Sequence, residues 1–80
     1  MNNIKKYGII AAMQEEMEEI KNIMENIEEK KIYELIFFEG EINNSNVVLV
    51  EAGVGKVNAT RVTQVLIDNF NIEAIINVGS

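Results

Sequence analysis

Two short, continuous runs of apolar residues predict strands near the two ends of the chain. The run Tyr7–Ala12 predicts a first strand over Lys6–Ala11, and the run Ile72–Val78 predicts a last strand. Continuous apolar runs of this length suit strands that are buried on both faces, as in the centre of a parallel sheet. We therefore expect both strands to lie inside a parallel sheet.

Apolar residues at spacings of three and four predict two amphipathic helices. The first runs from Gln14 to about Glu28, with glutamates on its solvent face, and the second ends near Asn71. Met17 and Met24 are expected in the core. The apolar faces consist of Met17, Ile20, Met24 and Ile27 in the first helix, and of Val57, Val62, Val65, Leu66 and Phe70 in the second.

β-Branched and aromatic residues between Lys31 and Ala52 predict extended structure in the form of a meander. Gly40, between two glutamates, allows a bend or a bulge in that segment. The cluster Asn43–Asn46 predicts a turn, because asparagine tolerates left-handed backbone angles. The predicted order of elements is β-α-β-β-β-α-β, which indicates an α/β fold.

The predicted last strand is followed only by Gly79 and Ser80, with no helix after it. A parallel sheet needs helices on both faces, and a naked apolar strand tends to pair or aggregate. We therefore expect residues 1–80 to be the N-terminal part of a single domain that is cut short. The alternative is a complete, non-catalytic binding or assembly module, which would behave as a cooperative monomer or a defined oligomer in circular dichroism and size-exclusion experiments.

The composition removes several classes of function. The chain has 13 acidic and 7 basic residues, a formal net charge of −6, and therefore no electrostatic footprint for nucleic acid or an anionic membrane. Cysteine and histidine are absent, which excludes disulfides, thiolate nucleophiles, imidazole bases and nearly all zinc chemistry. We expect no metal and no cofactor, and any acid or base must be a carboxylate, a lysine or a tyrosine.

The start of the chain superficially resembles a signal peptide. Lys5 and Lys6 precede the apolar run, but that run is too short and leads at once into Gln14–Glu16. We therefore expect a cytoplasmic protein.

Glu16 is the first candidate for chemistry, because it follows a predicted buried strand and begins a predicted helix. Open α/β sheets bind ligands at the carboxyl ends of their strands. The helix dipole keeps a carboxylate in the first turn ionised, which suits a general base that activates water. The alternative is that Glu16 only complements the dipole and faces solvent, as most glutamates in a first turn do.

A second candidate is Ala52–Lys56, which again joins an apolar strand to a helix and includes Gly53 and Gly55. Backbone N–H groups in such a turn can bind an anion or a sugar. The dinucleotide fingerprint fails because Asn58 replaces its third glycine, and the P-loop pattern fails at positions 50 and 57, which are both valine. The alternative is a tight turn in which the glycines only supply backbone freedom.

The third candidate is Asn77–Ser80, at the carboxyl end of the predicted last strand. In a parallel sheet, the strand ends at Met13–Glu16, Gly53–Gly55 and Gly79–Ser80 converge on one edge. The topology therefore predicts a single crevice that all three segments line.

The residues at these three strand ends resemble those of one family. Gly8–Met17 (GIIAAMQEEM), Glu51–Ala59 (EAGVGKVNA) and Ile75–Ser80 (IINVGS) are similar, in order and approximate spacing, to the N-terminal blocks of the 5'-methylthioadenosine/S-adenosylhomocysteine nucleosidases. The resemblance spans essentially the whole chain and includes the β-rich stretch between the first two blocks.

The resemblance implies a three-layer α/β/α phosphorylase/hydrolase-like fold and hydrolysis of the N-glycosidic bond of 5'-methylthioadenosine and S-adenosylhomocysteine, with release of adenine, in methionine salvage and nucleoside catabolism. It implies that Glu16 orients and deprotonates the attacking water. Met13 matches a residue beside the ribose, Val54 matches one that lines the pocket near the thio substituent, and Ser80 opens the family's Gly-Ser-Ala-Gly-Gly segment. Full-length relatives are homodimers, so the resemblance also implies a homodimer.

The chain departs from the family's pattern at its end. It stops before the rest of Gly-Ser-Ala-Gly-Gly, before a ribose-binding Met-Glu pair and before the aspartate that protonates the purine. Glycoside cleavage commonly needs both an acid and a base, so we expect these residues alone to be inactive.

Two other members of the same superfamily, a purine nucleoside phosphorylase and a futalosine-type hydrolase, remain as rivals. Ala12–Glu16 is acidic and offers no basic ligand for phosphate, which favours water as the nucleophile. The preference among thioadenosines stays open, since most of the specificity pocket would lie beyond Ser80.

Overall fold

The computed structural model describes residues 6–52 and 59–79. Within them the elements follow the order predicted from the sequence, so the α/β fold class and the order β-α-β-β-β-α-β are confirmed. The elements are β1 (Lys6–Ala11), α1 (Gln14–Ile23), β2 (Glu25–Ile32), β3 (Leu35–Ile42), β4 (Ser45–Glu51), α2 (Ala59–Asn69) and β5 (Ile72–Val78).

The strands of the described part form one mixed sheet in the order β2-β3-β4-β1-β5. β1 pairs in parallel with β4 on one side and with β5 on the other, whereas β3 pairs antiparallel with β2 and β4. The strands β4, β1 and β5 therefore all end at the same edge of the sheet, which is the edge where α/β proteins place their sites.

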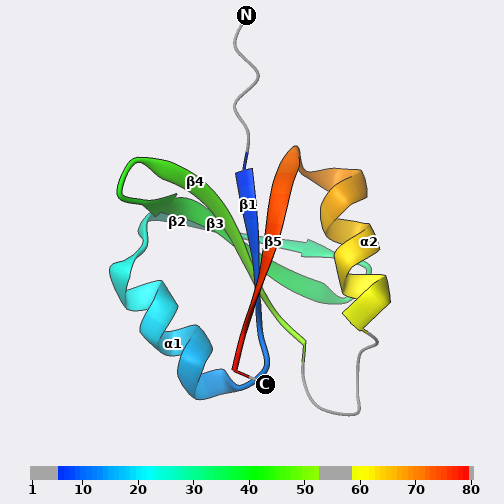
Figure 1. Ribbon diagram of the computed structural model, residues 1–80, viewed down its shortest axis with the longest axis horizontal. Coiled ribbons are helices and arrows are strands. Elements are labelled where there is room, and N and C mark those ends of the chain that lie inside the picture. Colours follow the sequence, from blue (N-terminus) through cyan, green and yellow to red (C-terminus); the bar gives the residue numbers. More distant parts are fainter. Residues whose placement is uncertain (1–5, 53–58, 80) are drawn as a thin grey trace, which may run out of the picture.

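The two helices cover opposite faces of the sheet, which gives three layers (Figure 1). Successive strand residues point to opposite faces, so β4 contributes Val47 and Leu49 to the core under α1, and Val48 and Val50 to the core under α2. Met17 of α1 is buried in the first of these cores, as predicted. Neither α1, with 10 residues, nor α2, with 11, is long and apolar enough to cross a membrane.

β5 has the predicted bounds but not the predicted burial. Within the described residues it pairs only with β1 and is therefore an outermost strand of the sheet. Ile72 and Ile75 pack against the core under α2, whereas Ile76 is 48% exposed. The expectation of a strand buried on both faces was therefore wrong for this chain, because α2 covers one face of β5 and no described element covers Ile76 on the other.

The first helix ends at Ile23 and not near Glu28, which corrects the sequence prediction. Met24 takes an extended conformation (φ −84°, ψ 149°), and residues from Glu25 onward pair with β3. Met24 still fills the core at 6% exposure, but Ile27 lies in β2 and is 38% exposed. Pairing with β3 supplies hydrogen bonds that override the helical spacing of the apolar residues.

Gly40 marks a bulge, but the extra residue lies in the neighbouring strand. Glu25 pairs with Glu41 and Glu28 pairs with Glu39, so β2 uses one residue more than β3 between these pairs. A Cβ on Gly40 would lie 2.8 Å from the carbonyl oxygen of Glu25. Glycine at this position therefore lets the bulged strand approach β3 closely.

Both hairpins turn through residues with positive φ. Asn43 (50°) and Asn44 (68°) form the turn predicted between β3 and β4. Tyr33 (51°) and Glu34 (68°) form the other turn, between β2 and β3, which no turn residue announces in the sequence. Positive φ at both central residues is the pattern of the type I′ hairpin, which matches the twist of the strands.

Candidate functional site

Glu16 lies in the first turn of α1, directly after the carboxyl end of β1. Met13 is the N-cap residue, and its carbonyl accepts the hydrogen bond of the Met17 N–H at 3.1 Å, which begins the helix. The backbone N–H of Met13 in turn donates to Oε1 of Glu16, also at 3.1 Å. The Glu16 side chain therefore folds back toward the strand end, as a residue at this position does in a capping box.

The carboxyl ends of β1, β4 and β5 meet as predicted. The Ala52 N–H donates to the carbonyl of Ala11 at 3.0 Å, and the Ala12 N–H donates to the carbonyl of Val78 at 3.0 Å. Figure 1 shows the end of β5 beside the loop that joins β1 to α1. The backbones that carry the first and third predicted segments are therefore joined at one edge of the sheet.

Gly79 lies against the carboxylate of Glu16. Its φ is +74°, and a Cβ built on it would overlap Cδ and both carboxylate oxygens of Glu16. This contact brings together two residues that the sequence analysis had placed at separate strand ends. Val54 and Ser80, together with the turn Gly53–Gly55, lie outside the described residues.

The candidate base is partly buried, whereas the residues around it are open to solvent. Glu16 is of intermediate burial, Glu15 and Gln14 are exposed, and the Met13 side chain is 48% exposed. Glu16 is thus partly buried and accepts a hydrogen bond from the Met13 N–H, whereas the adjacent Glu15 is exposed. A carboxylate that is anchored through one oxygen and still reachable from solvent can accept a proton from a bound water.

A groove of about 320 Å³ lies near this edge, between α1 and strand β3. It shares the first turn of α1 with the candidate site, but neither Met13 nor Glu16 lines it. The lining residues are Gln14, Met17, Glu18, Lys21, Glu34, Leu35, Ile36, Phe38 and Glu51.

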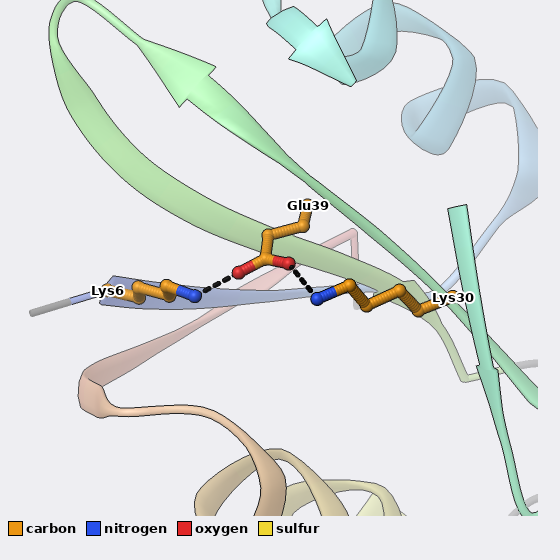
Figure 2. Close-up of polar contacts among 3 residues, drawn as sticks. All are labelled: Lys6, Lys30 and Glu39. Atoms are coloured by element: carbon orange, nitrogen blue, oxygen red, sulfur yellow. Dashed lines mark hydrogen bonds and ion pairs between the residues drawn. The ribbon is translucent and has the colours of Figure 1, made fainter. Parts of the chain in front are cut away.

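A second polar cluster lies on the α2 side of the sheet (Figure 2). Nζ of Lys30 lies 2.8 Å from Oε1 of Glu39, and Lys6 binds the other carboxylate oxygen. Both ammonium groups also lie near the ring of Phe70, at 5.9 and 5.7 Å from its centroid. Lys6 begins β1 and Glu16 follows its end, so this cluster is at the far end of the strand from the candidate site.

The charges of this cluster shift its pKa values. Burial raises the pKa of the Glu39 carboxyl, but the hydrogen bonds and positive charges of Lys30 and Lys6 outweigh it and hold that pKa below its usual range. The hydrogen bond to Glu39 raises the pKa of Lys30. This cluster was not predicted from the sequence, because its three residues lie on three different strands and form no local motif.

Comparison with known proteins gives a family match over nearly the whole chain. The Phosphorylase superfamily matches residues 6–80. The 5'-methylthioadenosine/S-adenosylhomocysteine nucleosidase of Listeria welshimeri is 52% identical over 73 residues, which cover 91% of this chain and 31% of that protein. The enzyme of the same name from Staphylococcus epidermidis is 44% identical over 73 residues, with 91% and 32% covered.

Solved structures show the same relationship. The 5'-methylthioadenosine/S-adenosylhomocysteine nucleosidase of Neisseria meningitidis, in complex with methylthio-immucillin-A, superposes with a TM-score of 0.86 at 35% identity, covering 94% of this chain and 32% of that one. Futalosine hydrolase of Helicobacter pylori gives a TM-score of 0.81 at 27% identity, with 92% and 32% covered. The chain therefore spans about a third of the length of these relatives.

Proposed function

This chain belongs to the phosphorylase superfamily, and on that premise we propose that it is the N-terminal part of a nucleosidase that hydrolyses 5'-methylthioadenosine and S-adenosylhomocysteine. The curated relatives that carry this name are more similar to the chain, at 52% and 44% identity, than the futalosine hydrolase structure at 27%. The same order holds among the solved structures, at 35% for the nucleosidase and 27% for the futalosine hydrolase, which favours the nucleosidase over this rival.

The observation that carries the proposal is the placement of the Glu16 carboxylate. It lies at the shared carboxyl edge of β4, β1 and β5, is bonded to the Met13 N–H at 3.1 Å, and rests on Gly79. At this position it takes a proton from water as the water oxygen bonds to the anomeric carbon of the ribose. The glycosidic C–N bond breaks in the same reaction, and adenine leaves with a proton from an acid.

Water is favoured over phosphate as the nucleophile by the charge of this edge. The described residues here, Ala11–Met17, Glu51–Ala52 and Val78–Gly79, contain glutamates and no lysine or arginine. A phosphate monoanion or dianion would be repelled by these carboxylates and would need cationic ligands. A neutral water needs only a hydrogen-bond acceptor.

The remaining roles are proposed from the resemblance. Met13, whose exposed side chain stands at the same edge, packs beside the ribose. Val54 and Ser80 are not among the described residues. By the resemblance, Val54 lines the pocket near the thio substituent and Ser80 opens the Gly-Ser-Ala-Gly-Gly segment. The acid for the leaving group is expected in a segment that these residues do not include, so we propose that the chain by itself is inactive. A homodimer is proposed on the same resemblance, and a cytoplasmic location on the short apolar run Gly8–Met13, which leads at once into Gln14–Glu16.

The experiment compares the product of the complete reading frame that carries this chain with residues 1–80 alone. Adenine release from 5'-methylthioadenosine and S-adenosylhomocysteine is followed by chromatography, with futalosine as a third substrate and with inorganic phosphate added or omitted. We expect phosphate-independent adenine release by the complete product and none by residues 1–80. A requirement for phosphate, cleavage of futalosine alone, or release by residues 1–80 would contradict the proposal.

A further inference from the structure

Gly79 and Glu16 touch across the sheet edge, although one follows β5 and the other belongs to α1. The carboxylate of Glu16 occupies the space that a side chain on residue 79 would need, since a Cβ there would overlap Cδ and both oxygens. Backbone at φ +74° also disfavours any residue with a Cβ. Glycine is thus favoured at this position for two separate reasons. It adopts the positive φ, and it leaves room for the Glu16 carboxylate.

The carboxylate is therefore restrained from two directions. The Met13 N–H holds Oε1 from the side of α1, at 3.1 Å, and Gly79 bounds it from the side of β5. These two sides are tied together at the sheet edge, because the Ala12 N–H donates to the Val78 carbonyl at 3.0 Å. A displacement of the β5 end would therefore move the surface on which the carboxylate rests.

We propose that Gly79 is a positioning residue for Glu16. Its missing side chain seats the carboxylate at the edge of the sheet, so the orientation of the base is set by β5 as well as by its own helix. The contact between Gly79 and Glu16 is independent of the proposed function, whereas its effect on catalysis rests on that function. General bases act only within hydrogen-bond reach of the proton that they abstract, so a small displacement of Glu16 is enough to lower the rate.

The alternative is that Gly79 only satisfies the backbone turn after β5. In that case the identity of residue 16 would not change the effect of a substitution at residue 79. A double-mutant cycle separates the two roles, because only residues in contact show a coupling.

The first experiment is a thermal unfolding cycle in the complete protein, with Glu16→Ala, Gly79→Ala and the double variant. In the native background Glu16→Ala should lower Tm, because it removes the bond to the Met13 N–H. In the Gly79→Ala background the same change should raise Tm, because it removes the overlap with the new Cβ. Equal decreases in both backgrounds would overturn the proposal.

Gly40→Ala is the matched control, because its Cβ would meet Met24 and Glu25 and not Glu16. Glu16→Ala should lower Tm in that background as it does in the native protein. If Gly79→Ala fails to fold, the cycle is repeated with Gly79→Asn, because asparagine tolerates a positive φ. A Glu16→Ala change that lowers Tm equally in the native and Gly79→Asn backgrounds then overturns the proposal.

The second experiment measures kcat for adenine release with Gly79→Ala in the native and Glu16→Gln backgrounds. We expect a loss on the order of 10²-fold in the native background, with KM nearly unchanged, and no further loss when Glu16 is already glutamine. The same factor in both backgrounds would show a merely structural role. Absence of adenine release by the unsubstituted protein would refute the proposed function and leave the unfolding cycle to decide the role of Gly79.

Discussion

Nζ of Lys30 lies 2.8 Å from Oε1 of Glu39, so an ion pair joins the edge strand β2 to its neighbour β3 (Figure 2). The other oxygen of Glu39 binds Lys6 of β1, which extends the connection across β4. The side chain of Glu39 is only 16% exposed, whereas most of β2 faces solvent. The pair therefore anchors a strand that buries little of its own surface.

In the complete protein, Glu39→Gln should lower Tm at neutral pH by roughly 2–4 °C for a loss of about 1 kcal/mol, the shift expected of a domain about three times as long as this chain. The pKa of Glu39 is lowered in the folded chain, so its stabilisation is complete above the pKa of an unfolded glutamate and disappears as pH falls through the lower folded value. The difference in Tm between the two proteins should therefore shrink below about pH 4. Thermal unfolding by circular dichroism across pH 2–7 measures it.

Glu29→Gln is the control for that experiment, because Glu29 is exposed on β2. It should change Tm little at any of these pH values. A difference between native and Glu39→Gln proteins that stays constant down to the lowest pH would show that the Glu39 charge is not the source of the stabilisation.

Glu16→Gln should lower kcat for adenine release by about 10²–10⁴-fold in the complete protein, because an amide cannot accept the proton of the attacking water. KM should change little, since Gln keeps the size of Glu and Oε1 can still accept from the Met13 N–H. Steady-state kinetics measure both constants. Glu15→Gln, in the same helical turn but exposed, should leave kcat near the native value; an equal loss in both variants would argue against a specific role for Glu16.

Gly40→Ala should destabilise the fold by about 1–3 kcal/mol, because its Cβ would lie 2.8 Å from the Glu25 carbonyl oxygen and 2.9 Å from Cε of Met24. Gly8→Ala is the comparison. Its Cβ would lie 3.2 Å from Cδ1 of Leu66, a side-chain atom that can move. Urea unfolding should therefore rank Gly40→Ala as the more destabilising change, and the reverse order would contradict the bulge as the reason for Gly40.

Glu34→Asn should stabilise the β2–β3 hairpin by about 0.5–1 kcal/mol, because Glu34 holds a φ of 68° that asparagine adopts at lower cost. The reciprocal change, Asn44→Glu, puts glutamate at the matching turn position with the same φ and should destabilise by a similar amount. Chemical unfolding of both variants tests the pair. Destabilisation by Glu34→Asn would mean that the Glu34 side chain makes a stabilising contact.

The candidate site was predictable in outline because a parallel sheet constrains where its strands end. The apolar runs predict β1 and β5, and a parallel arrangement of these strands predicts that Glu16 and Gly79 follow the same edge of the sheet, as the parallel pairing of β1 with β5 confirms. The contact between the two was not predictable. Glycine at position 79 permits the φ of +74°, and glutamate at the third position of α1 favours the bond to the Met13 N–H, but no local pattern shows that these two residues meet.

Local sequence patterns predict the bounds of β1 and β5, the turn at Asn43–Asn44 and the order of the described elements, because continuous apolar runs and turn residues act locally. Tertiary structure decided where α1 ends, since Glu25–Ile32 has no strand pattern of its own and becomes a strand only by pairing with β3. It also decided which charges meet at Glu39, and that β5 lies at an edge of the sheet. These features depend on hydrogen bonds and contacts between segments far apart in the chain, which local spacing does not encode.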